Sequence, residues 1–173
     1  MSRQEAALEL RRRILQFVAQ YPGVHVRELA RLLDRSQAIT DYHVTALVDA
    51  GLLRAERLDQ YLRLYPSAAD EPLTKREIET LGLLRDRRVL HIALYLLDKD
   101  APSRHADIAR ATEMGKSLVT FHLAKLVEHG LVRLDGDEYR LAQPKLVRQL
   151  LGRHQPTPDL REEFADLWDA LYD

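Results

Sequence analysis

An internal repeat without gaps dominates this sequence of 173 residues. Residues 27–53 align with residues 106–132 at a constant shift, so that His43 matches His122 and Gly51 matches Gly130. Seven of the 27 aligned pairs are identical, and most of the others keep their chemistry. Apolar spacing alone is common to many helices, but a shared arginine, histidine and terminal glycine is not. The sequence therefore predicts two copies of one supersecondary unit.

Each copy opens with a helix, and the first of these is predicted over residues 3–20. Ser2 and Glu5 stand three apart at its start, which is the spacing of a capping box, and Pro22-Gly23 follow its end. A short helix, a tight turn, a longer helix and a β-hairpin come next. In the first copy we expect the short helix over 26–33, the turn over 34–36, the longer helix over 37–50, and the two strands of the hairpin over 52–56 and 61–65. Gly51 is the expected left-handed cap of the longer helix, the third of the copy.

The second copy repeats this order. Thr74 and Glu77 form another capping-box pattern, which opens a helical stretch to about Leu97 with a break near Gly82. Ser103 is the expected cap of the short helix. We expect the short helix over 106–111, the turn over 113–115, the third helix over 116–129, and the two hairpin strands over 131–134 and 138–141. Gly130 is the expected cap of the third helix, and Asp135-Gly136 is the expected hairpin turn. Each hairpin carries a tyrosine and then a proline. The spacing of these residues predicts a first hairpin, or wing, that is one residue longer than the second.

Three helices followed by a two-stranded hairpin are the elements of a winged helix-turn-helix. The sequence therefore predicts a mainly α fold with small β-hairpin wings, in which two tandem winged helix-turn-helix modules precede a C-terminal amphipathic helix. We expect the modules at residues 1–66 and 74–154, a linker at 67–73, and the acidic C-terminal helix at 155–173.

The runs HVRELARLL and YHVTALVDAGLL, with Ser36 between them, resemble the winged helix-turn-helix transcriptional regulators of bacteria and archaea, of the ArsR-like and MarR-like kind. The tandem arrangement is similar to archaeal two-module regulators. This resemblance covers about residues 8–66 and 85–144. It implies a regulator of transcription that binds duplex DNA, with the third helix in the major groove and the wing on the backbone.

The outward face of each third helix is the expected DNA site. The opposite face, which carries Thr40, Val44 and Leu47 in the first copy, is expected to pack on the first two helices. The remaining side chains can bind base edges or phosphates. With the turn and the first wing, the predicted DNA-binding residues are Arg35, Ser36, Gln37, Asp41, Tyr42, His43, Thr45, Arg54, Arg57, Lys116, Ser117, Thr120, His122 and Lys125. Both histidines of this set either donate to DNA or lie half-buried against the wing.

The two wings differ in charge. The first carries Arg54, Arg57 and Arg63, whereas the second has an acidic tip at residues 134–138. Because phosphates repel acidic side chains, we hypothesise that the first copy is the stronger DNA reader. The second copy then contributes through its third helix or binds protein.

A further helix is predicted to start at Pro158-Asp159, with Asp159 and Glu162 as its capping pattern. Its wide apolar stripe consists of Leu160, Phe164, Leu167, Trp168 and Leu171. Two interpretations stay open: the stripe docks on the second module, or it forms a homodimer interface.

The formal net charge is only −1, because the acidic C-terminal segment offsets a small positive net charge of the rest of the chain. Residues 1–154 carry 25 Lys and Arg against 21 Asp and Glu, and residues 155–173 carry one against six. This near-neutral balance keeps a rival class open, a tandem winged-helix protein that binds other proteins of the chromosome or transcription machinery without touching DNA. The chain has no cysteine, which excludes thiolate chemistry and fits a reducing cytoplasm.

The sequence has no phosphate-binding glycine loop, nucleophile elbow or HExxH motif, so we expect no enzyme, cofactor or metal site. Nothing approaches the ~20 consecutive apolar residues of a membrane span, and the N-terminus has no signal-peptide pattern. We therefore expect a cytoplasmic, nucleoid-associated protein in which any small-molecule effector binds between the modules.

Overall fold

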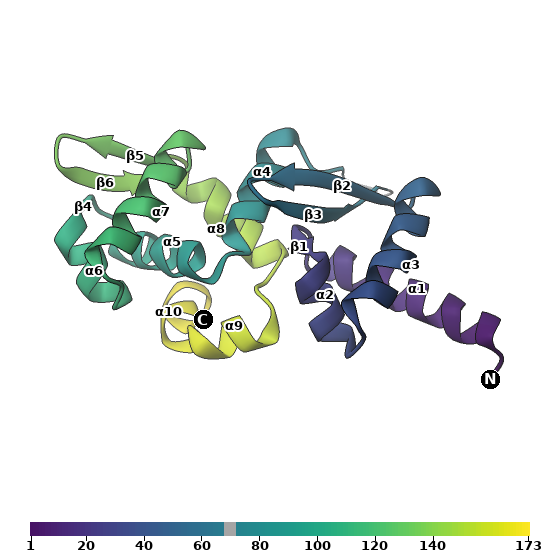
Figure 1. Ribbon diagram of the computed structural model, residues 1–173. Coiled ribbons are helices and arrows are strands. Elements are labelled where there is room, and N and C mark those ends of the chain that lie inside the picture. Colours follow the sequence, from purple (N-terminus) through teal and green to yellow (C-terminus); the bar gives the residue numbers. More distant parts are fainter. Residues whose placement is uncertain (68–71) are drawn as a thin grey trace. The chain divides into compact units, whose positions relative to one another are not determined.

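The computed structural model describes residues 1–67 and 72–173 (Figure 1). They fall into two compact units, within Met1–Leu83 and Leu84–Asp173. Each unit has helices followed by a wing of antiparallel strands, which confirms the predicted fold class of two tandem winged helix-turn-helix modules. Most of the expected linker, residues 68–71, lies outside the described residues.

The first unit contains three helices, a sheet of three strands and a fourth helix. Ser2 and Glu5 form the predicted capping box of the first helix. Strands β1 and β2 both pair antiparallel with β3, which gives the order β1-β3-β2. The elements are α1 (Arg3–Gln20), β1 (Val24–His25), α2 (Val26–Leu33), α3 (Gln37–Asp49), β2 (Leu53–Leu58), β3 (Tyr61–Pro66) and α4 (Lys75–Leu84).

The second unit repeats this order, with a helix after its wing, and adds two further helices at its end. Its sheet has the order β4-β6-β5, again with antiparallel pairs. The elements are α5 (Arg87–Lys99), β4 (Ser103–Arg104), α6 (His105–Thr112), α7 (Lys116–Glu128), β5 (Val132–Asp135), β6 (Glu138–Leu141), α8 (Pro144–Arg153), α9 (Pro158–Glu163) and α10 (Ala165–Tyr172).

The inner faces of the helices form the cores as the apolar pattern predicts. In the first unit, Ile14 of α1, Leu29 of α2 and Leu64 of β3 are fully buried. Thr40, Val44 and Leu47 of α3 face inward, and the equivalent Val119, Leu123 and Leu126 of α7 do the same in the second unit. The burial of each large apolar side chain stabilises the fold by about 1.5–3 kcal/mol, so the third helices are fixed by their inner faces and leave their outer faces open.

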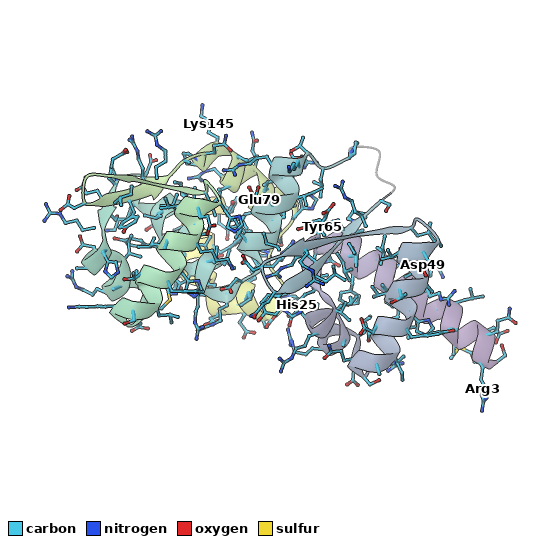
Figure 2. The ribbon with its side chains drawn as sticks, turned by 45° about the horizontal axis from the view of Figure 1, so that its top comes forward. Arg3, His25, Asp49, Tyr65, Glu79 and Lys145 are labelled. Atoms are coloured by element: carbon cyan, nitrogen blue, oxygen red, sulfur yellow. The ribbon has the colours of Figure 1, made fainter. Side chains whose placement is uncertain are left out.

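The helix expected to break near Gly82 breaks instead at Asp86, whose carboxylate caps α5. The glycine has a packing role, because a Cβ on Gly82 would come within 2.8 Å of Leu58 Cδ2 and of the Tyr65 hydroxyl oxygen. The hydroxyl of Tyr65, a residue labelled in Figure 2, donates to the carbonyl oxygen of Ile78 at 2.7 Å. Helix α4 therefore packs on the first wing and lies in the first unit, although the sequence assigned residues 74–83 to the second module.

Three local features differ from the predictions or were missed. Strands β1 and β4 have two residues each, too few to show an alternating pattern, and the sequence did not predict them. Ser103 belongs to β4 and is not the cap of α6, which begins after Arg104 without a side-chain cap hydrogen bond. Helix α8 was also missed, because Pro144 stands in its first turn and was taken only as the end of the hairpin.

The wings differ in length by more than one residue. Val24 pairs with Leu64 and the equivalent Ser103 pairs with Tyr139, so Tyr139 corresponds to Leu64 and not to Tyr61. Strands β2 and β3 pair over six positions, and β5 and β6 over four. The second hairpin turns at residues 136–137, one position later than predicted. The matching Tyr and Pro residues of the two wings are therefore not structural equivalents.

Candidate nucleic-acid interface

Each helix-turn-helix contains a left-handed residue at the end of its second helix. Asp34 (φ 53°) ends α2 and Glu113 (φ 54°) ends α6. In the first unit the Arg35 amide then donates to the Ala30 carbonyl oxygen at 3.0 Å, and the equivalent amide of the second unit makes the same bond at 3.2 Å. The predicted tight turns are thus confirmed. The backbone enters the third helix with the same conformation in both units.

Glycine ends both third helices in the same way. Gly51 and Gly130 have φ values of 74° and 71°, a region that favours glycine because it has no Cβ. The next amide donates to the carbonyl oxygen of Leu47 in α3 and of Leu126 in α7, at 2.9 Å in each case. These are the bonds of a Schellman motif, so the predicted caps are confirmed and each wing leaves its third helix along the same route.

The outer face of α3 and the preceding turn present polar side chains to solvent. Ser36 is exposed, but its hydroxyl accepts a hydrogen bond of 3.2 Å from the Ile39 amide and so caps the helix. Asp49 marks the end of this helix in Figure 2. The other predicted residues of this face are all exposed: Arg35, Gln37, Asp41, Tyr42 and Thr45.

The outer face of α7 is more basic than that of α3. Lys116, Ser117 and Thr120 are exposed, and Lys125 is half-buried. The Thr120 hydroxyl lies 2.9 Å from Nε2 of His105. Where the first unit has a serine cap, this one has glycine and no side-chain cap hydrogen bond, so the first-turn amides of this 13-residue helix are open to an anion.

His43 and His122 lie in the interior, with 8% and 4% of their surface exposed. Nδ1 of His43 accepts a hydrogen bond of 3.2 Å from Nε of Arg11. Both ring nitrogens of His122 are buried without a hydrogen-bond partner among the described residues. Burial lowers the pKa of both imidazoles, and the Arg11 charge lowers that of His43 further. Of the two open interpretations, the structure supports buried histidines rather than donors to DNA.

The first wing presents fewer free cations than its sequence suggests. Arg63, one of the three cations that the sequence places in this wing, is buried, and its Nη1 donates to the carbonyl oxygen of Gly23 at 3.2 Å. Arg54 is exposed but pairs with Glu56, its Nε at 2.6 Å from Oε1. Arg57 is exposed near the tip of the hairpin.

Two of the three acidic side chains at the tip of the second wing, Asp135 and Asp137, are paired with arginines. Asp135 lies 2.8 Å from Arg140 and 3.9 Å from Arg133, and Asp137 lies 3.6 Å from Arg104 of the neighbouring strand β4. The wing therefore carries local charge compensation that the tip sequence does not reveal. These pairs reduce the difference in charge between the two wings, on which the hypothesis of a stronger first DNA reader was based. That hypothesis stays a prediction.

The C-terminal stripe is folded against its own unit. Phe164 and Trp168 are buried, whereas Leu160, Leu167 and Leu171 are half-buried. Helix α10 packs on α5, and the Phe164 ring lies 4.6 Å from the His91 ring between centroids. These contacts favour docking over a dimer interface.

The expected single C-terminal helix is two helices. The chain bends at Phe164 between α9 and α10. Thr157 precedes α9 without a side-chain cap hydrogen bond, so Asp159 is not its cap but a residue of its first turn. Glu163 at the end of α9 pairs with Arg87 of α5, and the Tyr172 hydroxyl donates to the Arg148 carbonyl oxygen at 2.8 Å.

The second unit also contains a cleft of about 580 Å³ between the starts of α5 and α7 and the C-terminal helices. Arg88, Met114 and Leu167 are among its lining residues. Within residues 1–67 and 72–173, no three His, Asp or Glu side chains gather so that they could hold a metal ion. No helix in this part of the chain is both long and apolar enough to cross a membrane.

Two helix-turn-helix units, each with a wing and an open outer face on its third helix, define a tandem winged helix-turn-helix protein of the regulator class. Residues 8–76 match a family described as an N-terminal HTH domain, and residues 89–133 match the family described as bacterial regulatory protein, arsR family. The predicted resemblance to such regulators is thereby confirmed.

The chain is also similar to an uncharacterized HTH-type transcriptional regulator from Methanocaldococcus jannaschii, with 27% identity over 125 residues. The match covers 72% of this chain and 30% of the relative. The chain thus matches less than a third of that relative's length.

Proposed function

We propose that this protein regulates transcription by binding duplex DNA through the third helices of both modules, in the cytoplasm and at the nucleoid. One observation carries the proposal. The same turn, third helix and glycine cap occur twice, and in both copies the inner face is buried while the polar outer face is exposed. The matches to helix-turn-helix families over both copies support it.

The first module supplies side chains suited to base edges. The Gln37 amide can pair with adenine, and the methyl group of Thr45 can touch thymine. Arg35 at the turn before α3 and Arg57 on the wing are exposed cations, and each can neutralise a phosphate. The hydroxyl of Tyr42 can form a hydrogen bond with a base edge or with a phosphate.

The second module is suited to phosphate contact at the start of its third helix. The first-turn amides of α7 lack a side-chain cap, and Lys116 and Ser117 stand beside them. A phosphate at this position gains from the helix dipole as well as from the lysine charge. Because Asp135 and Asp137 of this wing are paired with arginines, we propose that this module also contacts DNA.

The test uses the full chain and duplexes that it selects from a random pool. One variant combines Arg35→Ala with Gln37→Ala in the first module, and another combines Lys116→Ala with Ser117→Ala in the second. We expect each to weaken binding by about 10- to 100-fold, since a base or phosphate contact contributes about 1–3 kcal/mol. Arg12→Ala, which removes an exposed arginine from α1, is the control.

Unequal losses from the two variants would also decide which module is the stronger reader. If neither variant binds more weakly than the Arg12→Ala control, the third helices are not the DNA site. The rival class, a subunit that binds only proteins, is favoured by the pairing of wing arginines with acids. It predicts that no duplex is selected from the pool.

A further inference from the structure

Among the described residues, the two most exposed aromatic side chains lie at equivalent positions of the two third helices. Tyr42 of α3 is 68% exposed, and Phe121 of α7 is 62% exposed. A ring that stands open at the centre of a polar face is typical of a contact anchor, because its large apolar surface gains most from being covered. The repetition of this arrangement in both units makes it a feature of the module.

Each ring rests on the buried histidine that follows it. The Tyr42 and His43 rings lie 5.1 Å apart between centroids, and the Phe121 and His122 rings 5.2 Å apart, with an interplanar angle of 79° in both pairs. This is an edge-to-face contact, which restricts the orientation of the exposed ring. The histidines are packed in the core and thus give both rings the same fixed base.

Each ring has short neighbours on one flank of its helix and larger ones on the other. Four positions before and three positions after each ring the side chains are short and exposed, namely Ala38, Thr45, Ser117 and Ala124, whereas Ile39 and Leu118 stand three positions before it. Each ring is therefore open on the flank of the short side chains. It offers a large exposed apolar group near the middle of the helix.

A phenyl ring has no donor or acceptor, so Phe121 cannot recognise the hydrogen-bonding groups of base edges. The apolar group that the major groove offers is the C5 methyl of thymine. We infer that Phe121 and Tyr42 determine specificity by packing on thymine methyl groups opposite the middle of each third helix. This inference rests on the proposed function, because it requires α3 and α7 to face the groove.

The test removes the methyl group without changing the hydrogen-bonding edge. In a duplex that the full chain has selected, each thymine is replaced in turn by uracil, and the affinity is measured at constant salt. A buried methyl contributes about 0.8 kcal/mol, so each contacted thymine should lose about fourfold in affinity when replaced. Phe121→Ala should abolish this loss at one set of positions, and Tyr42→Ala at another.

Leu8→Ala, which removes an exposed apolar side chain from α1, is the matched control and should retain the full uracil response. Phe121→Ala should unfold at the temperature of the wild type, because the ring is mostly exposed. If no duplex is bound at all, the proposed function and the inference both fail. If duplexes are bound but uracil has no effect, or has the same effect on wild type and Phe121→Ala, the inference alone is overturned.

Discussion

Nε of Arg11 in α1 donates a hydrogen bond of 3.2 Å to Nδ1 of His43 in α3. A ring nitrogen that accepts leaves the proton of a neutral imidazole on Nε2, so the bond fixes one tautomer of His43. The equivalent His122 has no such partner among the described residues. Two histidines at matching positions of a repeat therefore differ by one partly buried hydrogen bond, and this difference can be measured.

We expect Arg11→Met to lower the free energy of unfolding by about 1–2 kcal/mol, because His43 loses its donor while it stays buried. Arg12→Met removes a neighbouring exposed arginine and should change it by less than about 0.5 kcal/mol. Urea unfolding followed by circular dichroism measures both variants. Equal unfolding midpoints of the two variants would show that the hydrogen bond between Arg11 and His43 contributes nothing to stability.

Replacing the two histidines by leucine should have opposite effects. His43→Leu deprives Arg11 of its acceptor and should lower the free energy of unfolding by about 1–3 kcal/mol. His122→Leu removes a buried polar ring without a partner and should leave it unchanged or raise it by about 1 kcal/mol. The same urea experiment compares the two, and a large loss in His122→Leu would contradict the interpretation of this ring as unpartnered.

Stability should fall as the pH drops below about 6.5. Burial lowers the pKa of His25, His43, His91 and His122 below the ordinary value of 6.5, so the unfolded chain takes up protons that the folded chain does not. The stabilising contribution is complete above that value and is lost on acidification, with a slope of at most about 1.4 kcal/mol per pH unit for each histidine.

Urea unfolding at about pH 7.5, 6.5 and 5.5 measures this slope. The His122→Leu variant should show a shallower slope than wild type, whereas Arg12→Met should not. A free energy of unfolding that does not change over this range would contradict the assignment of buried, neutral histidines.

The sequence predicted those elements whose causes are local. The capping box of Ser2, the turn at Asp34 and the glycine cap at Gly51 each depend on residues within a few positions of one another, and all are confirmed. The buried faces of α3 and α7 follow from helical periodicity in the same way.

The elements that the sequence did not predict depend on distant partners. Strand β1 exists because Val24 reaches Leu64, and Arg63 is buried because it meets the Gly23 carbonyl oxygen. The pairing of Asp137 needs Arg104, which is far from residues 134–138 in sequence, whereas Asp135 pairs with arginines of its own hairpin. The spacing of residues within one segment of the sequence contains no information on contacts with distant residues. The sequence therefore could not distinguish exposed arginines from buried ones.

The C-terminal helices should stabilise their own unit. Trp168 is almost fully buried, and Trp168→Ala should lower the free energy of unfolding by about 3–5 kcal/mol. Asp169→Ala, an exposed neighbour on α10, is the control and should change it by less than about 0.5 kcal/mol.

Deletion of residues 156–173 separates docking from dimer formation. Light scattering should give the same number of subunits before and after the deletion, while the unfolding temperature falls. A halved mass with unchanged stability would show instead that the apolar stripe is a dimer interface.

The proposed function requires that the outer faces of α3 and α7 bind duplex DNA. Its direct test is the affinity of the full chain for a random-sequence duplex as the salt concentration rises from about 50 to 200 mM. We predict that the logarithm of the binding constant falls linearly with that of the salt concentration, and that Lys116→Ala reduces the slope by about one. Absence of measurable binding at the lowest salt would contradict the claim.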